Sequence, residues 1–136
     1  MFKFLTFICM ISLVLSERPD WYPENPNAIE AECTNKYSIS AETVEKIRAY
    51  QIEDTPAIRS ALLCSAVGKN IYRPEFGFEP ERYVIGIKYG LNVDCKVEYI
   101  SGCAQKYMDI ESQEEKYFKF FKCVIENRKD NCKKIE

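Results

Sequence analysis

The cysteines are the residues of this chain whose type and number could do chemistry. The 136-residue sequence contains 7 Cys and no His. Without histidine there is no Ser/His or Cys/His nucleophile pair, no histidine ligand for zinc and no imidazole pH switch. No Cys-x-x-Cys pair is present either, so we expect no metal and no cofactor. Disulfide formation is the cysteine chemistry that remains.

Two groups of carboxylates could supply the acid and the base of a catalytic pair. One lies within 109–115, and the other is formed by Glu79 and Glu81. Both groups fall where helices are expected to start, a position at which the helix dipole favours negative charge. We interpret them as solvated charges and expect no enzymatic activity.

The overall charge excludes another class of partner. The sequence has Lys+Arg 19 and Asp+Glu 21, a formal net charge of -2, and no long basic run. Nucleic-acid and anionic-membrane binders need a concentrated positive surface, so we expect neither partner. The basic residues near the carboxyl terminus are interrupted by Asp130 and followed by Glu136, which is typical of a solvated tail.

Residues 1–16 predict a secretory signal peptide. Lys3 gives a positively charged start, and residues 4–15 form an apolar stretch that is too short to span a membrane. Small residues stand at the positions that precede a cleavage site, the second of them being Ser16. We therefore expect residues 17–136 to form one secreted, extracellular domain.

Cleavage at this point would change the cysteine count. It would remove Cys9 and leave an even number of cysteines, which in a small secreted chain predicts disulfides. Six cysteines allow about 15 pairings, and their number alone does not choose among them. The remaining cysteines are Cys33, Cys64, Cys95, Cys103, Cys123 and Cys132.

Capping residues and prolines predict an all-α domain with about six short helices around these cysteines. Ser40 is an expected N-cap, and Thr55 followed by Pro56 is a strong start signal. Pro80 starts a further helix that Gly90 is expected to end. No segment alternates with period two, so we expect no β structure. After a proline-rich arm at 17–27, the expected helices cover about 27–37, 40–52, 56–68, 80–90, 93–108 and 113–128, with 70–79 as a loop.

The cysteines stand on these expected helices at positions where disulfides can staple them. Cys95 and Cys103 are eight residues apart, which separates them by roughly 12 Å along a helix axis. Cys123 and Cys132 are again more than two turns apart. If the last two helices are antiparallel, pairing Cys103 with Cys123 brings Cys95 near Cys132. The remaining two cysteines would then tie the first helix to the third.

The spacing of four cysteines resembles that of insect odorant-binding proteins, which are small secreted helical domains with six cysteines. In that family three residues separate the second and third cysteines, and eight separate the fifth and sixth. Cys33 and Cys64 match the first and third positions. Cys103 and Cys123 match the fourth and sixth.

Two of the family's cysteines are replaced in this register, by Ser60 at the second position and Glu114 at the fifth. The family's bridges join the first cysteine to the third, the second to the fifth and the fourth to the sixth. The two missing cysteines are therefore partners of each other. The chain resembles a C-minus member of the family over about 28–127, with Cys95 and Cys132 as an additional bridge that departs from the pattern.

The resemblance implies a function in olfaction and transport, namely the reversible binding of small lipophilic ligands such as odorants or pheromones. An apolar cavity between the helices would hold the ligand. Tyrosine suits such a cavity because it offers apolar area and one hydroxyl group. Most apolar residues at helical spacing belong to the core. The candidate ligand-binding residues are apolar and aromatic positions on helix faces. They are Tyr50, Leu63, Val67, Tyr83, Ile87, Tyr107, Phe118 and Phe121.

Two other functions stay open at this point. The related salivary branch of the superfamily sequesters biogenic amines or lipid mediators, and an amine binder should place carboxylates inside its cavity. A secreted helical structural or signalling protein would instead have a solid core without a cavity. For a carrier or a scavenger the expected partner is a small molecule, with no stable membrane insertion. The sequence does not specify a receptor or a homodimer.

Overall fold

The structure is a computed structural model that describes residues 18–135. The expected signal peptide at 1–16, together with Cys9, lies outside the described residues. Within 18–135 the chain forms six α-helices, one short 3₁₀ helix and a two-stranded sheet. The prediction of an all-α, disulfide-stapled domain with about six helices is confirmed.

Side-chain caps begin the three helices of the amino-terminal half. Thr55 Oγ1 accepts a hydrogen bond of 3.1 Å from the backbone N–H of Ile58, and Ser40 caps the preceding helix in the same way. That helix was expected to reach Ile52, but it ends earlier because Tyr50 takes a left-handed conformation with φ 66°. The three helices are α2 (Pro26–Lys36), α3 (Ala41–Arg48) and α4 (Pro56–Gly68).

Three further α-helices, preceded by a short 3₁₀ helix, form the carboxyl-terminal half. Gly90 was expected to end the first of them, but it lies inside the helix, which continues to Leu91. The helix stops because Asn92 adopts the left-handed conformation, with φ 59°, that commonly terminates helices. After the short helix η1 (Pro74–Phe76), the helices are α5 (Pro80–Leu91), α6 (Val97–Tyr107) and α7 (Gln113–Glu126).

A short antiparallel sheet corrects the prediction that no β structure would form. Strand β1 (Val93–Cys95) pairs with β2 (Cys132–Lys134), with Cys95 directly opposite Cys132. Because β1 occupies 93–95, the helix expected at 93–108 begins only at Val97; the helix expected at 113–128 ends at Glu126. Cys95 and Cys132 lie on the two strands. Strands of three residues are too short to show a period-two pattern, so the sequence carried no signal for them.

The three disulfides join Cys33 to Cys64, Cys95 to Cys132 and Cys103 to Cys123. All three predicted pairs are present, including the one that departs from the odorant-binding pattern. The first ties α2 to α4, the second joins the two strands, and the third ties α6 to α7.

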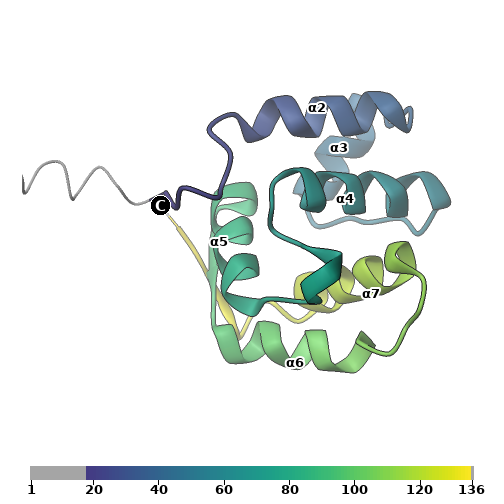
Figure 1. Cartoon of the computed structure of the whole chain (residues 1–136). Helices are drawn as coiled ribbons and strands as arrows, with labels where there is room; N and C mark the ends of the chain where they lie inside the picture. Colours follow the sequence, from purple (N-terminus) through teal and green to yellow (C-terminus); the bar gives the residue numbers. More distant parts are fainter. Residues whose placement is uncertain (1–17, 136) are drawn as a thin grey trace, which may run out of the picture.

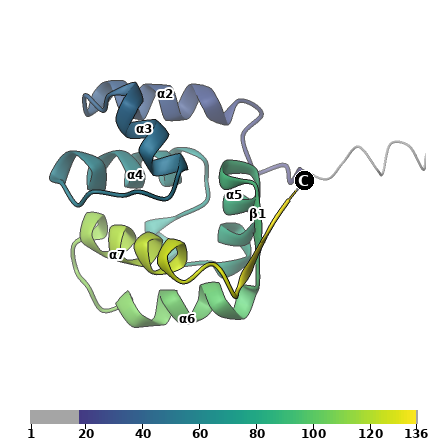
Figure 2. The same ribbon diagram turned by 180° about the vertical axis from the view of Figure 1, so that it is seen from behind.

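The helices stack in successive layers. In Figure 1, α2 lies above α4, α7 lies below α4, and α6 forms the opposite edge, while α5 stands beside these layers. Seen from behind, α3 lies across the α2–α4 side, and β1 and the carboxyl-terminal strand run along α5 (Figure 2). This arrangement leaves α3 as an outer wall on one side of the molecule.

Aromatic side chains fill the core beneath these layers. Phe120 of α7 is fully buried; its ring stacks on that of Phe78 at a centroid distance of 4.2 Å and meets that of Tyr83 edge-on at 4.3 Å. Tyr72 and Tyr117 extend the cluster, with ring centroids 5.5 Å apart. Such contacts stabilise the fold beyond simple area burial.

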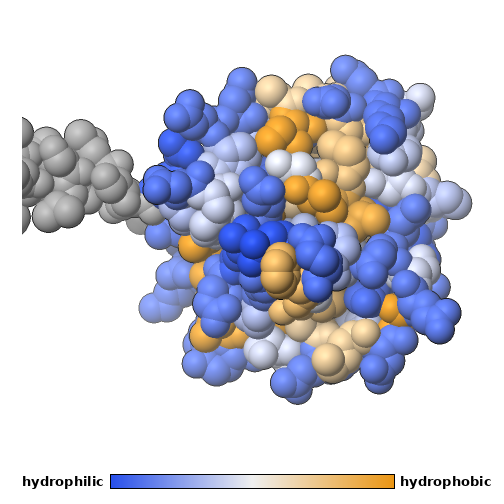
Figure 3. All heavy atoms as spheres, viewed as in Figure 1, coloured by the Kyte–Doolittle hydropathy of each residue, from blue (hydrophilic) through white to orange (hydrophobic). Residues whose placement is uncertain are grey.

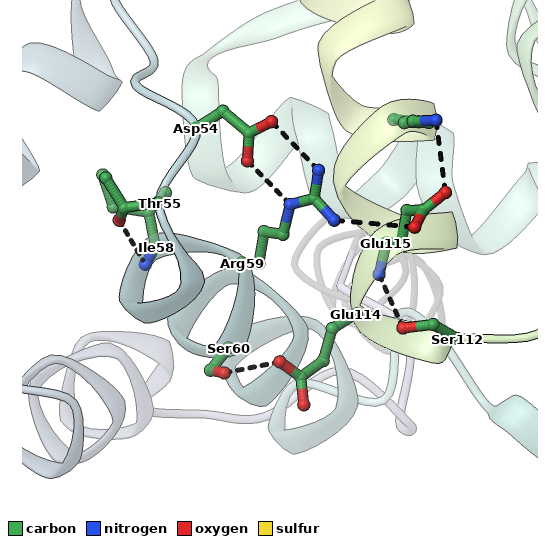
Figure 4. A network of polar contacts seen from close by, with 9 residues as sticks. Asp54, Thr55, Ile58, Arg59, Ser60, Ser112, Glu114 and Glu115 are labelled. Atoms are coloured by element: carbon green, nitrogen blue, oxygen red, sulfur yellow. Dashed lines mark hydrogen bonds and ion pairs between the residues drawn. The ribbon is translucent and has the colours of Figure 1, made fainter.

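Polar contacts at the α4–α7 interface place the two replaced cysteine positions together. Ser60 donates a hydrogen bond of 2.6 Å to the Glu114 carboxylate, as Figure 4 shows. Nearby, Arg59 binds Asp54 through two nitrogens at 2.7 and 2.9 Å and approaches Glu115 of α7 at 3.8 Å. Ser60 and Glu114, which stand where the family's second and fifth cysteines are bonded to each other, are therefore in direct contact.

Candidate functional site

A cavity of about 130 Å³ lies between α2, α3, α4 and α5, and α7 contributes two side chains to it. Most of its lining is apolar, which is the character expected of a small-molecule site. Each of the five helices supplies part of the wall, so the cavity is a product of the tertiary packing. Its aliphatic and aromatic lining includes Val44, Ile47, Ile58, Ala61, Leu62, Ile71, Ile87, Leu91, Tyr117 and Phe121.

Two glycines of α5 form part of the cavity wall. A Cβ atom at Gly86 would lie 2.4 Å from Ile71 Cδ1, so glycine there permits the close approach of the segment after α4. A Cβ atom at Gly90 would have no neighbour within 4 Å. Open space therefore borders the last turn of α5, and a larger side chain at Gly90 would reduce the volume available to a ligand.

The charged part of the lining is a triad formed by Glu30, Arg48 and Lys69. Lys69 directly follows α4 and is only 6% exposed. Its Nζ donates to Glu30 Oε2 at 2.5 Å, while an Arg48 guanidinium nitrogen donates to Glu30 Oε1 at 2.5 Å. The pairing offsets the cost of burying a lysine in apolar surroundings. The triad holds two positive groups and one negative group.

Two tyrosines, together with Thr34 and Ser65, add uncharged polar groups to the wall. Tyr83 donates its hydroxyl hydrogen to Tyr117 Oη, and both residues line the cavity. Burial raises the pKa of Tyr83 well above the ordinary tyrosine value, and it raises that of Tyr117 as well. Both hydroxyls are therefore neutral at physiological pH and can offer hydrogen bonds without carrying charge.

The structure brings three of the eight candidate residues to the cavity, namely Tyr83, Ile87 and Phe121. The other five lie outside its lining. Phe118 is buried next to the Arg59 guanidinium, and Val67 is 41% exposed on the outer face of α4. Tyr50, Leu63 and Tyr107 are half-buried against the core.

Sequence reasoning missed the charged triad. Lys69 was the last residue before an expected loop, where a lysine is ordinarily a solvated charge that favours the helix carboxyl terminus. Its partner Glu30 is 39 residues away in the sequence, on another helix. No local pattern links the two residues, and only the packing of α2 against α4 shows that they meet.

The lining can bind small apolar molecules, and it offers little for catalysis. Among the described lining residues, Glu30 is the one carboxylate, and both of its oxygens already accept hydrogen bonds from cations. Two carboxylates of the possible acid/base groups are also engaged: Glu79 binds Arg73, and Glu114 accepts from Ser60. The Arg73 guanidinium lowers the pKa of Glu79, as expected for an ion-paired carboxylate.

The face of the molecule seen in Figure 3 is mixed in character. Hydrophobic side chains gather over the α2–α4 part of the view in Figure 3, and hydrophilic ones cover most of the periphery. No helix within 18–135 is long and apolar enough to cross a membrane. No cluster of possible metal ligands occurs among these residues.

Comparison with known proteins supports the structural picture. The model of the PBP/GOBP family, the pheromone-binding and general odorant-binding proteins, matches residues 20–127. This stretch runs from the proline-rich arm to the residue after α7, and it contains every residue that lines the cavity. No individual curated protein matches the chain.

Proposed function

Because the chain belongs to the PBP/GOBP family, we propose that it is a secreted carrier that reversibly binds small lipophilic molecules, odorants or pheromones, in this cavity. The observation that carries the proposal is the apolar cavity between α2 and α5. Moving an apolar ligand from water into such a space is favourable by about 25 cal/mol for each Å² of apolar surface buried. Binding of this kind needs no catalytic group.

The size of the cavity points to compact ligands. Its volume is about 130 Å³, and an apolar cavity of about 150 Å³ is large enough to hold benzene. The ligand body that fits without rearrangement is therefore a single small ring or a short branched chain. We propose Tyr83, Ile87 and Phe121 as ligand contacts, since they are the sequence-based candidates that line this space.

The lining favours a carrier of this kind over a scavenger of biogenic amines and over a protein without a cavity. A scavenger of amines needs a carboxylate that can pair with the ligand, and Glu30 is already held by Arg48 and Lys69. A helical structural or signalling protein would have filled the space with side chains. Secretion is supported by the three disulfides, which form in oxidising compartments. Mass analysis of the protein from its source should find Glu17 at the amino terminus.

A matched pair of glycine variants tests the site. Gly90 borders the cavity and Gly102 lies exposed on α6, and a Cβ atom at either position has no neighbour within 4 Å. Toluene added to the native protein should shift the NMR signals of the cavity residues. Gly90→Leu should weaken toluene binding about tenfold or more, because the new side chain occupies the space, whereas Gly102→Leu should leave it unchanged.

The control also guards against a general effect of leucine on a helix, because both variants remove a helical glycine. Native protein that shows no shift with toluene would contradict the proposal. Equal affinity in the two variants would place the ligand elsewhere in the molecule.

A further inference from the structure

We propose that the charged triad anchors the carboxylate of a small acidic ligand whose apolar body fills the cavity, an assignment that rests on the binding function proposed above. The triad and the apolar wall line the same space. A ligand placed there would meet cations at one end and aliphatic side chains elsewhere. A short branched or aromatic carboxylic acid has this division of polar and apolar surface.

The charge balance of the triad is the first argument. Lys69 and Arg48 each carry a positive charge, and Glu30 supplies one negative charge. Lys69 is 6% exposed, so water does little to screen its charge. One carboxylate between two cations leaves an excess positive charge at the edge of a largely apolar cavity. An anionic ligand would complete the balance.

The unused hydrogen-bond donors are the second argument. A lysine ammonium has three donors. Within residues 18–135, the Lys69 ammonium is bonded to Glu30 alone. Arg48 donates to Glu30 and makes a long contact of 3.5 Å with the Gly90 carbonyl. Both cations therefore retain N–H groups that could donate hydrogen bonds to a ligand carboxylate. Such charge-assisted hydrogen bonds are stronger than those between neutral groups.

The same geometry opposes a cationic ligand. Each Glu30 oxygen accepts from one cation, so an amine entering the cavity would compete with Lys69 and Arg48 for a single carboxylate. It would also stand near two like charges, which is unfavourable. The triad therefore ranks ligands in the order acid, then neutral alcohol, then amine.

Three ligands with the same branched tail test this order: isovalerate, isoamyl alcohol and isoamylamine. Their affinities for the full protein can be measured by NMR titration at neutral pH, where the acid is ionised. We expect isovalerate to bind about tenfold more tightly than the alcohol, because its carboxylate gains charge-assisted hydrogen bonds. The amine should bind most weakly.

A lysine variant isolates the contribution of the anchor. Lys69→Met removes the ammonium group, keeps an unbranched and only slightly shorter side chain, and leaves Glu30 paired with Arg48. It should lower isovalerate affinity about tenfold, to near that of the alcohol, and leave alcohol binding unchanged. Lys88→Met is the matched control, since Lys88 is exposed on α5 and lies outside the cavity lining.

A variant of the carboxylate should act in the opposite direction. Glu30→Gln leaves both cations without an anionic partner, which should destabilise the free protein. Isovalerate should then bind more tightly than to the native protein and raise the melting temperature by more than isoamyl alcohol does. Should Lys69→Met not fold, Arg48→Gln gives the same comparison at a more exposed member of the triad.

The outcomes separate this proposal from the carrier function. If the alcohol binds but the acid binds no more tightly, the carboxylate anchor is wrong and the carrier function stands. If none of the three ligands binds, the carrier function itself is contradicted. A higher affinity for the amine would overturn the charge argument directly.

Discussion

The molecule has two halves that are built differently. The packed half consists of α5, α6, α7 and the two strands, and the cavity half consists of α2, α3 and α4. Helix α7 buries seven of its 14 residues, whereas α3 buries none. Two disulfides lie in the packed half, and the cavity half has one, which bypasses α3. The aromatic core around α7 is therefore closely packed, whereas α3 is attached to the rest of the molecule by few buried contacts.

This difference assigns separate tasks to the two halves. Close packing fixes the positions of α5 and α7, so the base of the cavity keeps its shape. The α3 wall, which contributes Val44, Ile47 and Arg48 to the lining, makes few of the contacts that resist local opening. Entry and exit of a ligand would then involve α3 and leave the packed half undisturbed.

Truncating one side chain in each half gives the largest expected contrast. Phe120→Ala should lower the free energy of unfolding by about 3–5 kcal/mol, because it leaves a hole in the aromatic core. Ile47→Ala in α3 should cost only about 1 kcal/mol, since Ile47 is half-buried and already borders open space. Urea unfolding measures both. Equal losses would contradict the division into two halves.

A fourth disulfide across the α4–α7 interface would tie the two halves together. Ser60→Cys combined with Glu114→Cys places cysteines at two residues that are in hydrogen-bond contact. Closing this loop should stabilise the protein by up to about 4 kcal/mol, and engineered bridges commonly deliver less. Peptide mapping without reduction would detect the bridge, and the single variant Ser60→Cys is the control. Two free thiols under oxidising conditions would show that the backbones lie too far apart there.

Two glycines on α5 should respond in opposite directions to the same change. Gly86→Ala should destabilise the protein by about 1–3 kcal/mol, since its Cβ atom would overlap the Ile71 side chain where α5 meets the segment after α4. Gly90→Ala should stabilise it by about 0.5–1 kcal/mol, because the new methyl group meets nothing and alanine favours the helix. Thermal unfolding distinguishes them. A loss of stability in both variants would mean that Gly90 does not border open space.

Alkaline pH should affect the packed half, and this effect is the smallest because it is absent at neutral pH. Burial raises the pKa of Tyr83 and Tyr117, and it raises that of Tyr99 to about 12. In the unfolded chain these tyrosines lose their protons near the ordinary pKa of 10.0. The free energy of unfolding therefore keeps its full value below that pH and falls as the pH rises above it.

Urea unfolding at about pH 7 and about pH 11 would measure this loss. Tyr117→Phe should make the loss smaller, and Tyr89→Phe, at an exposed tyrosine, should leave it unchanged. A free energy of unfolding that stays constant over this range would show that the tyrosines are accessible to hydroxide in the folded state.

The parts of this fold that the sequence predicted are those governed by local chemistry. Ser40, Thr55 and Pro56 act on backbone groups within a few residues, so their positions mark helix starts directly. The three disulfides followed from an even cysteine count, antiparallel helices and a family register. The end of α5 was misplaced because Asn92, as well as glycine, can adopt a left-handed conformation.

The parts that the sequence did not predict depend on contacts between distant residues. Strand β1 pairs with a strand 37 residues away, and three residues carry no alternation. For the eight candidate ligand contacts, periodicity did not show which of them adjoin the cavity, which adjoin other side chains, or that Val67 faces solvent. The burial of Lys69 could not be predicted for the same reason, since it depends on pairing with Glu30 of another helix.

The disulfides of the packed half are nested, and this has a consequence for oxidative folding. The Cys103–Cys123 bridge lies inside the loop that Cys95–Cys132 closes. Once the inner bridge forms, the chain between the outer pair shortens to the arms 95–103 and 123–132, and the entropy cost of closing it falls. The inner bridge should therefore form first and template the outer one. The Cys33–Cys64 pair gains nothing from this order and would oxidise independently.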